Sequence, residues 1–147
     1  MDTDSEEFSD FFNVDFQLTE EMASTCEGEI TLAECTKALS TMQNNKSPGS
    51  DGLTTEFYRA LWDIISTYVV NSFNYAFNTG NLSISQRQGI IYLIPKKKED
   101  ALYLKNWRPV TLLNVDYKIA TKTIARRIEK ALPHLINRTQ TPGGTPI

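Results

Sequence analysis

The chain has 147 residues, 40% of them hydrophobic, which suffices for one domain with its own core. No apolar run reaches the roughly 18 residues that span a bilayer, and the acidic N-terminus lacks the basic and apolar regions of a signal peptide. These features argue against a membrane or secreted protein and favour a soluble intracellular one, cytoplasmic or nuclear. Cys26 and Cys35 fit no zinc spacing, so we interpret them as incidental or core thiols.

The net charge of -3 conceals a strong asymmetry along the chain. Residues 1–30 hold ten acids and no Lys or Arg, whereas residues 84–147 hold twelve Lys or Arg and four acids. This separation predicts a C-terminal half that faces a polyanion. We interpret residues 1–28 as a weakly ordered acidic leader.

Two helices are expected in the first half of the chain. Thr31 and Glu34 have the form of a capping box, so a helix begins there and ends before the turn-rich stretch 44–52. A longer helix is predicted over 54–78, with Gly80 as its stop. Its apolar stripe predicts a buried face made of Phe57, Leu61, Ile64, Ile65, Tyr68, Val69, Phe73, Ala76 and Phe77.

A β-hairpin is expected next. Residues 89–95 are apolar at every position, which predicts a strand buried on both sides. Residues 107–113 read as a second strand after a basic loop, so the two form an antiparallel hairpin with a long charged tip. Pro109 indicates that its strand lies at an edge or a bulge.

The last helix is predicted to begin at Asn114, a good N-cap, and to end at Leu132 before Pro133. Its expected buried side consists of Ile119, Ala120, Thr123, Ile124, Ile128, Ala131 and Leu132. Lys118, Lys122, Arg126 and Lys130 recur every four residues, which places four cations in one row. Residues 137–147 are expected to be disordered, and the fold class is α+β, mostly helical with one antiparallel hairpin.

Two groups of cations have chemistry to offer. Lys96 leaves the first strand where Arg108 enters the second, and two converging cations suit a triphosphate. Alternatively, Lys96 and its neighbours merely blunt an exposed hairpin tip. The helical row either follows a nucleic-acid backbone or is a solvated helix face.

The acids do not form a metal site. Asp51, Asp63, Asp100 and Asp116 lie on different elements and no Asp-Asp pair exists, so no two-metal centre is expected. The loop 46–52 lacks the spacing of a P-loop and reads as a turn between helices. His134 has no Ser, Cys or carboxylate constellation around it. We therefore predict no catalytic residue and no metal ligand.

Four motifs follow one another in an order that resembles the reverse transcriptases of non-LTR (LINE-type) retrotransposons. These are Asn45 to Leu53 followed by Glu56-Phe57-Tyr58, Ile90 to Lys97, Asn106 to Ile119, and Ile124 to Ile128. They are similar to that family's "KSPGxDG…EFY", "I-x-LIPKK", "N-[YWF]-RPISLLN-x-x-YKI" and "LANRL" patterns. The resemblance runs from about Glu29 to Gln140.

The resemblance implies that residues 29–136 are the fingers, with entry into the palm, of a right-hand polymerase. Lys96 and Arg108 match the cations that hold the triphosphate of the incoming nucleotide. The loop near the template is matched by Lys46, Gly49, Asp51 and Gly52, and the groove for template and primer by Lys118, Lys122, Arg126 and Lys130. The implied partners are an RNA template, a DNA primer and a dNTP, with Mg²⁺ only in the full-length polymerase.

The chain departs from the family after Gln140-Thr141, where Pro142 replaces the expected Gly-Phe. The palm strands with their aspartates, and the thumb, are therefore expected to be missing, and the chain alone is expected to be inactive. It is read as a truncated copy or a fragment of a longer product. The alternatives are a non-catalytic nucleic-acid-binding module and an inert relic of a retrotransposon.

Overall fold

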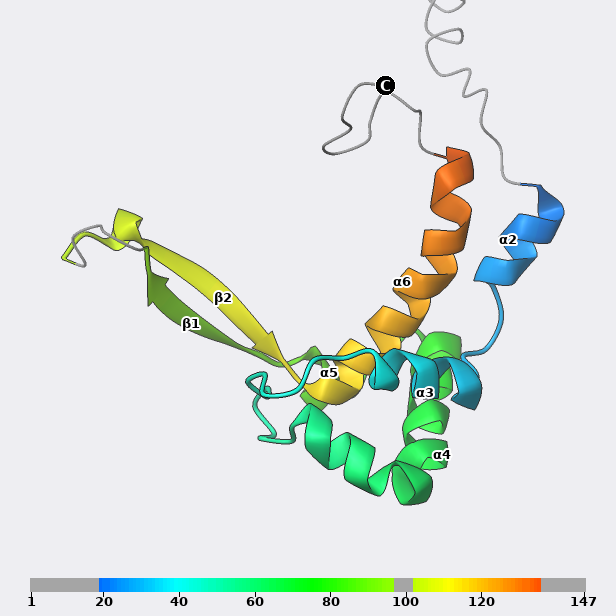
Figure 1. Ribbon diagram of the computed structural model, residues 1–147, viewed down its shortest axis with the longest axis horizontal. Coiled ribbons are helices and arrows are strands. Elements are labelled where there is room, and N and C mark those ends of the chain that lie inside the picture. Colours follow the sequence, from blue (N-terminus) through cyan, green and yellow to red (C-terminus); the bar gives the residue numbers. More distant parts are fainter. Residues whose placement is uncertain (1–18, 97–101, 136–147) are drawn as a thin grey trace, which may run out of the picture. The chain divides into compact units, whose positions relative to one another are not determined.

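The computed structural model describes residues 19–96 and 102–135, and the chain divides into two compact units. The larger unit is Glu29–Ile124, and the smaller comprises Met1–Gly28 and Ala125–Ile147. Figure 1 shows an α+β arrangement of helices and one antiparallel hairpin, which confirms the predicted fold class. The elements are α2 (Glu20–Cys26), α3 (Leu32–Ser40), α4 (Thr55–Thr79), α5 (Ile84–Arg87), β1 (Gly89–Pro95), η1 (Leu104–Asn106), β2 (Trp107–Leu113) and α6 (Val115–Leu135).

Helix α3 begins as the sequence predicts. The Thr31 hydroxyl accepts a hydrogen bond from the Glu34 backbone N–H at 3.3 Å, and the Glu34 carboxylate accepts one from the Thr31 N–H at 2.9 Å. This reciprocal capping box satisfies two of the backbone donors that a helix start leaves unpaired. Cys35, Ala38 and Leu39 are then buried on one side of the helix.

Helix α4 has the predicted extent but a different buried face. Thr54 caps its start, and Gly80 ends it in the left-handed conformation, with φ 69°. The buried side chains include Tyr58 and Trp62, whereas Ile64 and Tyr68, predicted to be buried, are 71% and 77% exposed. Phe57 and Phe77 are also exposed, so the predicted stripe is wrong at four positions. The helix is apolar on two sides, and periodicity alone does not tell which side meets α3.

The core of the larger unit is formed by α3, α4 and the first turns of α6, with Ile30 before them. Its buried members are Ile30, Cys35, Leu39, Tyr58, Trp62, Val70, Phe73, Val115, Ile119 and Ala120. Two polar contacts fix these elements to one another. The Trp62 indole N–H donates to the Thr36 hydroxyl at 2.8 Å, and the Asn74 amide bonds both the N–H and the C=O of Ile30, at 2.8 and 2.9 Å.

The hairpin is antiparallel, as predicted, and its register runs from Gly89 opposite Leu113 to Pro95 opposite Trp107. Its burial differs from the prediction, because every residue of β1 is exposed. Within the described ranges the sheet has two strands only, and the hairpin supplies no side chain to the core. Within the described residues, the apolar side chains of β1 stay uncovered, so the prediction that this strand is buried on both sides is wrong.

Helix α6 is longer than predicted, because it continues through Pro133 to Leu135. Proline lacks only its own N–H and disturbs the preceding turn, which costs least near the end of a helix. Part of the expected buried side is correct, since Ile119, Ala120, Thr123 and Ala131 are buried. The rest is wrong, because Ile124, Ile128 and Leu132 are exposed.

Three short elements were not expected from the sequence. They are α2, capped by the Thr19 hydroxyl, α5, which has a capping box between Ser83 and Gln86, and the 3-10 turn η1. Helix α2 lies within residues 1–28, which are predicted to form a weakly ordered leader. The remainder of the leader at 1–18 and the tail at 137–147 lie outside the described residues. Over the described ranges, none of the helices combines the length and the apolar character needed to cross a membrane.

Candidate nucleotide and nucleic-acid site

The register of the hairpin places the two predicted phosphate-binding cations on one face at one end. Arg108 lies opposite Ile94, and Lys96 follows Ile94 by two residues. Because side chains alternate between faces with a period of two, Lys96 continues the face that carries Ile94 and Arg108. Such diagonal neighbours have Cα atoms about 7–8 Å apart, a spacing at which two long cationic side chains can contact one phosphate chain.

The two cations differ in how they are held. Arg108 is exposed on β2. Lys96 is half-buried, and its ammonium donates to the backbone carbonyl of Lys105 at 2.8 Å while its N–H donates to the carbonyl of Asn106 at 2.7 Å. Arg108 is therefore the cation more open to a ligand, whereas Lys96 must exchange a carbonyl partner for a phosphate.

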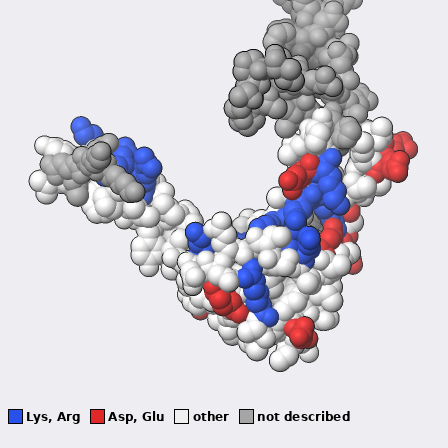
Figure 2. Space-filling model, in the orientation of Figure 1, with Lys and Arg blue, Asp and Glu red and all other residues white. Residues whose placement is uncertain are grey.

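A third basic side chain at this end of the hairpin was missed by the sequence reading. The Lys105 ammonium lies 5.5 Å from the centre of the Tyr103 ring, within the range of a cation–π contact. Figure 2 shows basic side chains gathered at the outer end of the hairpin. Lys97 and Lys98 lie outside the described residues, so the choice of Lys96 among the three consecutive lysines stays a prediction.

The loop between α3 and α4 packs onto the junction between β2 and α6. Gly49 is buried, and a Cβ atom there would lie 2.0 Å from the Asn114 Oδ1 and 2.5 Å from the Asn114 backbone nitrogen. The Asn114 Oδ1 accepts hydrogen bonds from the Ser50 hydroxyl at 3.3 Å and the Asp51 N–H at 3.4 Å. Its Nδ2 donates to the Ser85 carbonyl at 2.9 Å. The predicted template loop is thus fixed by Asn114, for which the sequence predicts only the role of a helix N-cap.

The other predicted loop residues have separate roles. Gly52 has φ +73° and donates its N–H to the Gly49 carbonyl at 3.3 Å, which closes the turn. The Asp51 carboxylate accepts the Leu53 N–H at 3.0 Å. Lys46 is exposed at the start of the loop. Of the four predicted template contacts, Lys46 presents an exposed charge, while the other three shape the turn.

The loop and the start of α6 bring two carboxylates into electrostatic contact. Asp116 lies in the first turn of α6, and its burial raises the pKa of its carboxyl above the ordinary value of 3.8. The negative charge of Asp51 raises that pKa further, while hydrogen bonds from the Tyr117 N–H and the Gln86 side chain oppose the shift. Burial also raises the pKa of Tyr58, with contributions from the same two carboxylates.

The first two cations of the predicted helical row hold the α3–α4 connection. The Lys122 ammonium donates to the Thr41 carbonyl at 3.0 Å, next to the end of α3, and the Lys118 ammonium reaches the Ser47 carbonyl at 3.5 Å. Both side chains are half-buried. The row is therefore not a uniform solvated face, because its first members bind backbone carbonyls of the larger unit.

The last two cations of the row belong to the smaller unit, where Arg126 is half-buried and Lys130 exposed. A buried cation of that unit is Arg127, which is not among the residues predicted from the sequence. It is 8% exposed, and its guanidinium donates to the carbonyls of Glu27 and Gly28 at 3.0 and 2.8 Å. The helical period indicates that Arg127 is buried, because it lies four residues after Thr123 and four before Ala131, which are both buried.

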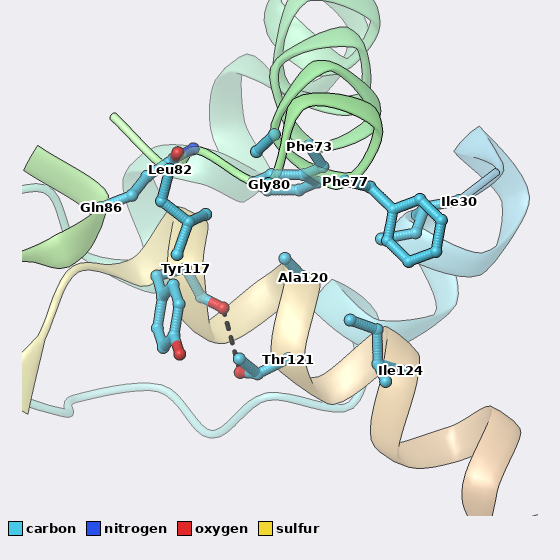
Figure 3. A pocket seen from close by; sticks show the side chains of 11 residues that line it. Ile30, Phe73, Phe77, Gly80, Leu82, Gln86, Tyr117, Ala120, Thr121 and Ile124 are labelled. Carbon is cyan, nitrogen blue, oxygen red and sulfur yellow. Dashed lines mark hydrogen bonds between the residues drawn. The ribbon is translucent and has the colours of Figure 1, made fainter. Parts of the chain in front are cut away.

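An apolar cavity of about 360 Å³ lies in the larger unit, between the end of α4, the following segment and α6 (Figure 3). Its lining includes Phe73, Phe77, Leu82, Tyr117, Ala120 and Ile124. Figure 3 shows the Thr121 hydroxyl donating to the carbonyl of Tyr117, at 3.0 Å, so this polar group is already used. The cavity offers no charged group to a nucleotide.

Over the described ranges, no group of three or more His, Cys, Asp or Glu side chains is arranged to hold a metal ion. No protein-family model matches the chain. Among curated proteins, the chain is similar to the transposon TX1 uncharacterized 149 kDa protein of Xenopus laevis, with 41% identity over 131 residues. That alignment covers 87% of this chain and 10% of the relative, so the chain spans about a tenth of the relative's length. The similarity supports a transposon origin for this chain.

Proposed function

We propose that the chain is the fingers part of the RNA-directed DNA polymerase of a non-LTR retrotransposon, and that it holds the triphosphate of the incoming nucleotide. The observation that carries the proposal is the register of the hairpin, in which Arg108 and Lys96 share one face at one end. The order of the four sequence motifs and the similarity to a transposon protein support it.

The chemistry of phosphoryl transfer explains why such a pair is useful. The reaction depends on positioning the phosphates and on neutralising charge as the bond to the leaving group breaks. The guanidinium of Arg108 offers two parallel N–H donors to phosphate oxygens, and the Lys96 ammonium adds a point charge. Arg108 is held within β2, and Lys96, just beyond the end of β1, is held by the hydrogen bond from its N–H to the Asn106 carbonyl.

The remaining predicted contacts fit a template path beside this site. Lys46 supplies a charge to the RNA backbone, and the turn from Gly49 to Gly52 shapes the surface next to it. Lys118 and Lys122 act as positioning residues, because they bind the carbonyls of Ser47 and Thr41. Arg126 and Lys130 supply the contacts to the template–primer duplex. Mg²⁺ would be held by another part of a longer polypeptide, and we expect no primer extension by these 147 residues alone, which contain no Asp-Asp pair.

Titration with dATP, followed by NMR, tests the triphosphate site. The chain contains two tryptophans, and Trp107 adjoins Arg108 whereas Trp62 is in the core. We expect dATP to shift the backbone amide signals of Arg108 and Trp107 and to leave the indole signal of Trp62 in place. Arg108→Ala should weaken binding about tenfold or more, as expected for a hydrogen bond to a charged group worth about 1.5–3 kcal/mol.

Arg87→Ala is the matched control, because Arg87 is an exposed cation in α5 just before β1. It should leave dATP binding unchanged. Equal affinity for dATP and for deoxyadenosine, which has no phosphate, would refute the site, and so would an Arg108→Ala variant that binds dATP as tightly as the parent chain.

A further inference from the structure

The two edges of the hairpin are not equivalent. The Lys96 N–H donates to the carbonyl of Asn106, one step beyond the last register pair, Pro95 opposite Trp107, so the N–H of residue 96 points toward β2. In an antiparallel ladder, hydrogen-bonded pairs alternate with non-bonded ones. The backbone groups of Ile90, Tyr92 and Ile94 therefore point toward β2. Those of Gly89, Ile91 and Leu93 point outward from the opposite edge of β1.

The outer edge of β2 is interrupted, whereas that of β1 is continuous. The same alternation turns Trp107, Pro109 and Thr111 outward from β2, and Pro109 has no N–H to donate. Arg108 adds a charge to this strand. By contrast, β1 carries no charged residue between Gly89 and Pro95. Charges and prolines are the usual means by which proteins protect an edge from pairing, and β1 has neither before Pro95.

The side chains along β1 are apolar on both faces and open. Ile91 is 65% exposed and Tyr92 54%, and these two residues face opposite sides of the sheet. An isolated two-stranded hairpin is at best marginally stable in water, so additional strands that cover such residues would stabilise it. Another apolar strand would both pair with the open edge of β1 and cover its exposed side chains.

We propose that β1 pairs antiparallel with β1 of a second copy of this chain, which makes a four-stranded sheet in the order β2–β1–β1–β2. With the two-fold axis at Ile91, the outward groups of Gly89 meet those of Leu93 of the other copy, and Ile91 meets its own counterpart. Every outward N–H from Gly89 to Leu93 then has an acceptor, while Pro95 falls beyond the paired segment.

A second copy fits this edge for two reasons. The strand is uncharged, so two copies meet without repulsion, and both faces remain apolar across the new junction. Association also stops at two copies, because β2 forms both outer edges of this sheet and Pro109 has no N–H to donate there. The Arg108 ends of the two hairpins point in opposite directions and stay open, so this dimer does not depend on the proposed nucleotide site.

Analytical ultracentrifugation of the full 147-residue chain over a wide range of concentration tests the dimer. The paired segment is short compared with standard protein interfaces, so we expect a reversible, concentration-dependent dimer. Ile91→Pro removes one outward N–H and should raise the dissociation constant at least about tenfold, equivalent to about 1.4 kcal/mol. Thr111→Pro removes an outward N–H at the same level of β2 and should leave the dissociation constant unchanged.

Amide hydrogen exchange followed by NMR tests the dimer in the parent chain, without introducing a proline into a strand. In the parent chain, raising the concentration should slow exchange at Ile91 and Leu93 and leave Thr111 unaffected. Ile91→Lys, which keeps the backbone N–H but places a charge on the strand, should also weaken the dimer. A chain that stays monomeric at all concentrations would overturn the proposal, as would a dimer that Ile91→Pro and Ile91→Lys leave intact.

Discussion

Two glycines of one loop are needed for different physical reasons. At Gly49 a Cβ would lie 2.5 Å from the Asn114 backbone nitrogen and 2.6 Å from the Leu113 carbonyl carbon, atoms that cannot move aside. At Gly52 there is open space, but φ is +73°, a conformation that costs an L-residue about 1 kcal/mol or somewhat more. Within this loop, glycine is therefore required at Gly49 because a Cβ atom would clash, and at Gly52 because φ is positive.

We therefore expect Gly49→Ala to lower the free energy of unfolding by about 1–3 kcal/mol, the usual range for overpacking, and more than Gly52→Ala does. Denaturant unfolding of both variants measures the difference. Adding Asn114→Ala to Gly49→Ala should not restore stability, because the backbone of residues 113 and 114 still blocks the Cβ. Full recovery in the double variant would show that the side chain of Asn114 is the only obstacle.

Asp116 makes stability depend on pH in a direction fixed by its shift. Burial raises the pKa of its carboxyl in the folded chain, so the folded state binds a proton over a pH range in which the unfolded state has lost it. Stability should therefore fall as the pH rises from 3.8 through the raised pKa. Asp116→Asn should flatten that part of the stability curve and stabilise the chain at neutral pH.

Glu56 provides a control of opposite sign for the same titration. A hydrogen bond from the Asn45 N–H is the largest cause that lowers the pKa of its carboxyl. Its stabilising contribution is present above the ordinary pKa of a glutamate and is lost as the pH falls through the lowered one. Glu56→Gln should thus lower the free energy of unfolding at neutral pH, and the further loss of stability on acidification should be smaller than in the parent chain. Identical plots of stability against pH for Asp116→Asn and Glu56→Gln would contradict the opposite pKa shifts assigned to these two carboxyls.

The bounds of the longer elements could be predicted from the sequence because their signals are local. Thr31, Thr54 and Gly80 cap helices through contacts within a few residues, and the turn residues between them forbid continuation. The faces that become buried could not be predicted in the same way. Helix α4 is apolar on both sides, and which side packs depends on tertiary contacts such as that of Trp62 with Thr36, 26 residues away.

That division within α4 predicts a contrast between two aromatic residues of the same helix. Trp62 is buried and bonds Thr36, whereas Tyr68 is 77% exposed. Trp62→Ala should cost about 3–5 kcal/mol of unfolding free energy, and Trp62→Phe about 1 kcal/mol through the lost hydrogen bond. Tyr68→Ala should change stability by less than about 0.5 kcal/mol. Chemical denaturation measures these losses. The order Trp62→Ala, Trp62→Phe, Tyr68→Ala, from largest to smallest, would support burial of the Trp62 side of α4, and the reverse order would refute it.

At the scale of the whole molecule, the charge separation predicted contact with a polyanion, and this stays a prediction. The structure refines which cations are free to make it, because Lys118 and Lys122 already bind loop carbonyls while Lys46 and Lys130 are exposed. No sequence pattern distinguishes an engaged lysine from an open one, since the carbonyl partners come from residues about 70–80 positions away.

Binding of single-stranded RNA at several salt concentrations should show a steep fall in log affinity with log salt. Lys46→Ala should reduce that slope by about 0.7, the contribution of one phosphate contact on a single strand. Arg87→Ala should leave the slope unchanged. A flat salt dependence in the parent chain would argue against the nucleic-acid role of its basic half.

The antiparallel hairpin could be predicted from local patterns in the sequence, and the structure confirms it. The binding of phosphate by Arg108 and Lys96 stays a prediction. The buttressing of the loop by Asn114 could not be predicted in this way, because Gly49 and Asn114 are far apart in the sequence and meet only in the folded chain. The buried Arg127 was missed because a charged residue was not considered on an apolar face.

The hairpin contributes no side chain to the helical core. Substitutions that remove the proposed phosphate contacts of the hairpin should therefore leave the packing of α3, α4 and α6 intact. A chain that has lost the proposed binding would then still fold. Cellular degradation of unfolded proteins would not remove such a chain, and substitutions along the two strands would accumulate.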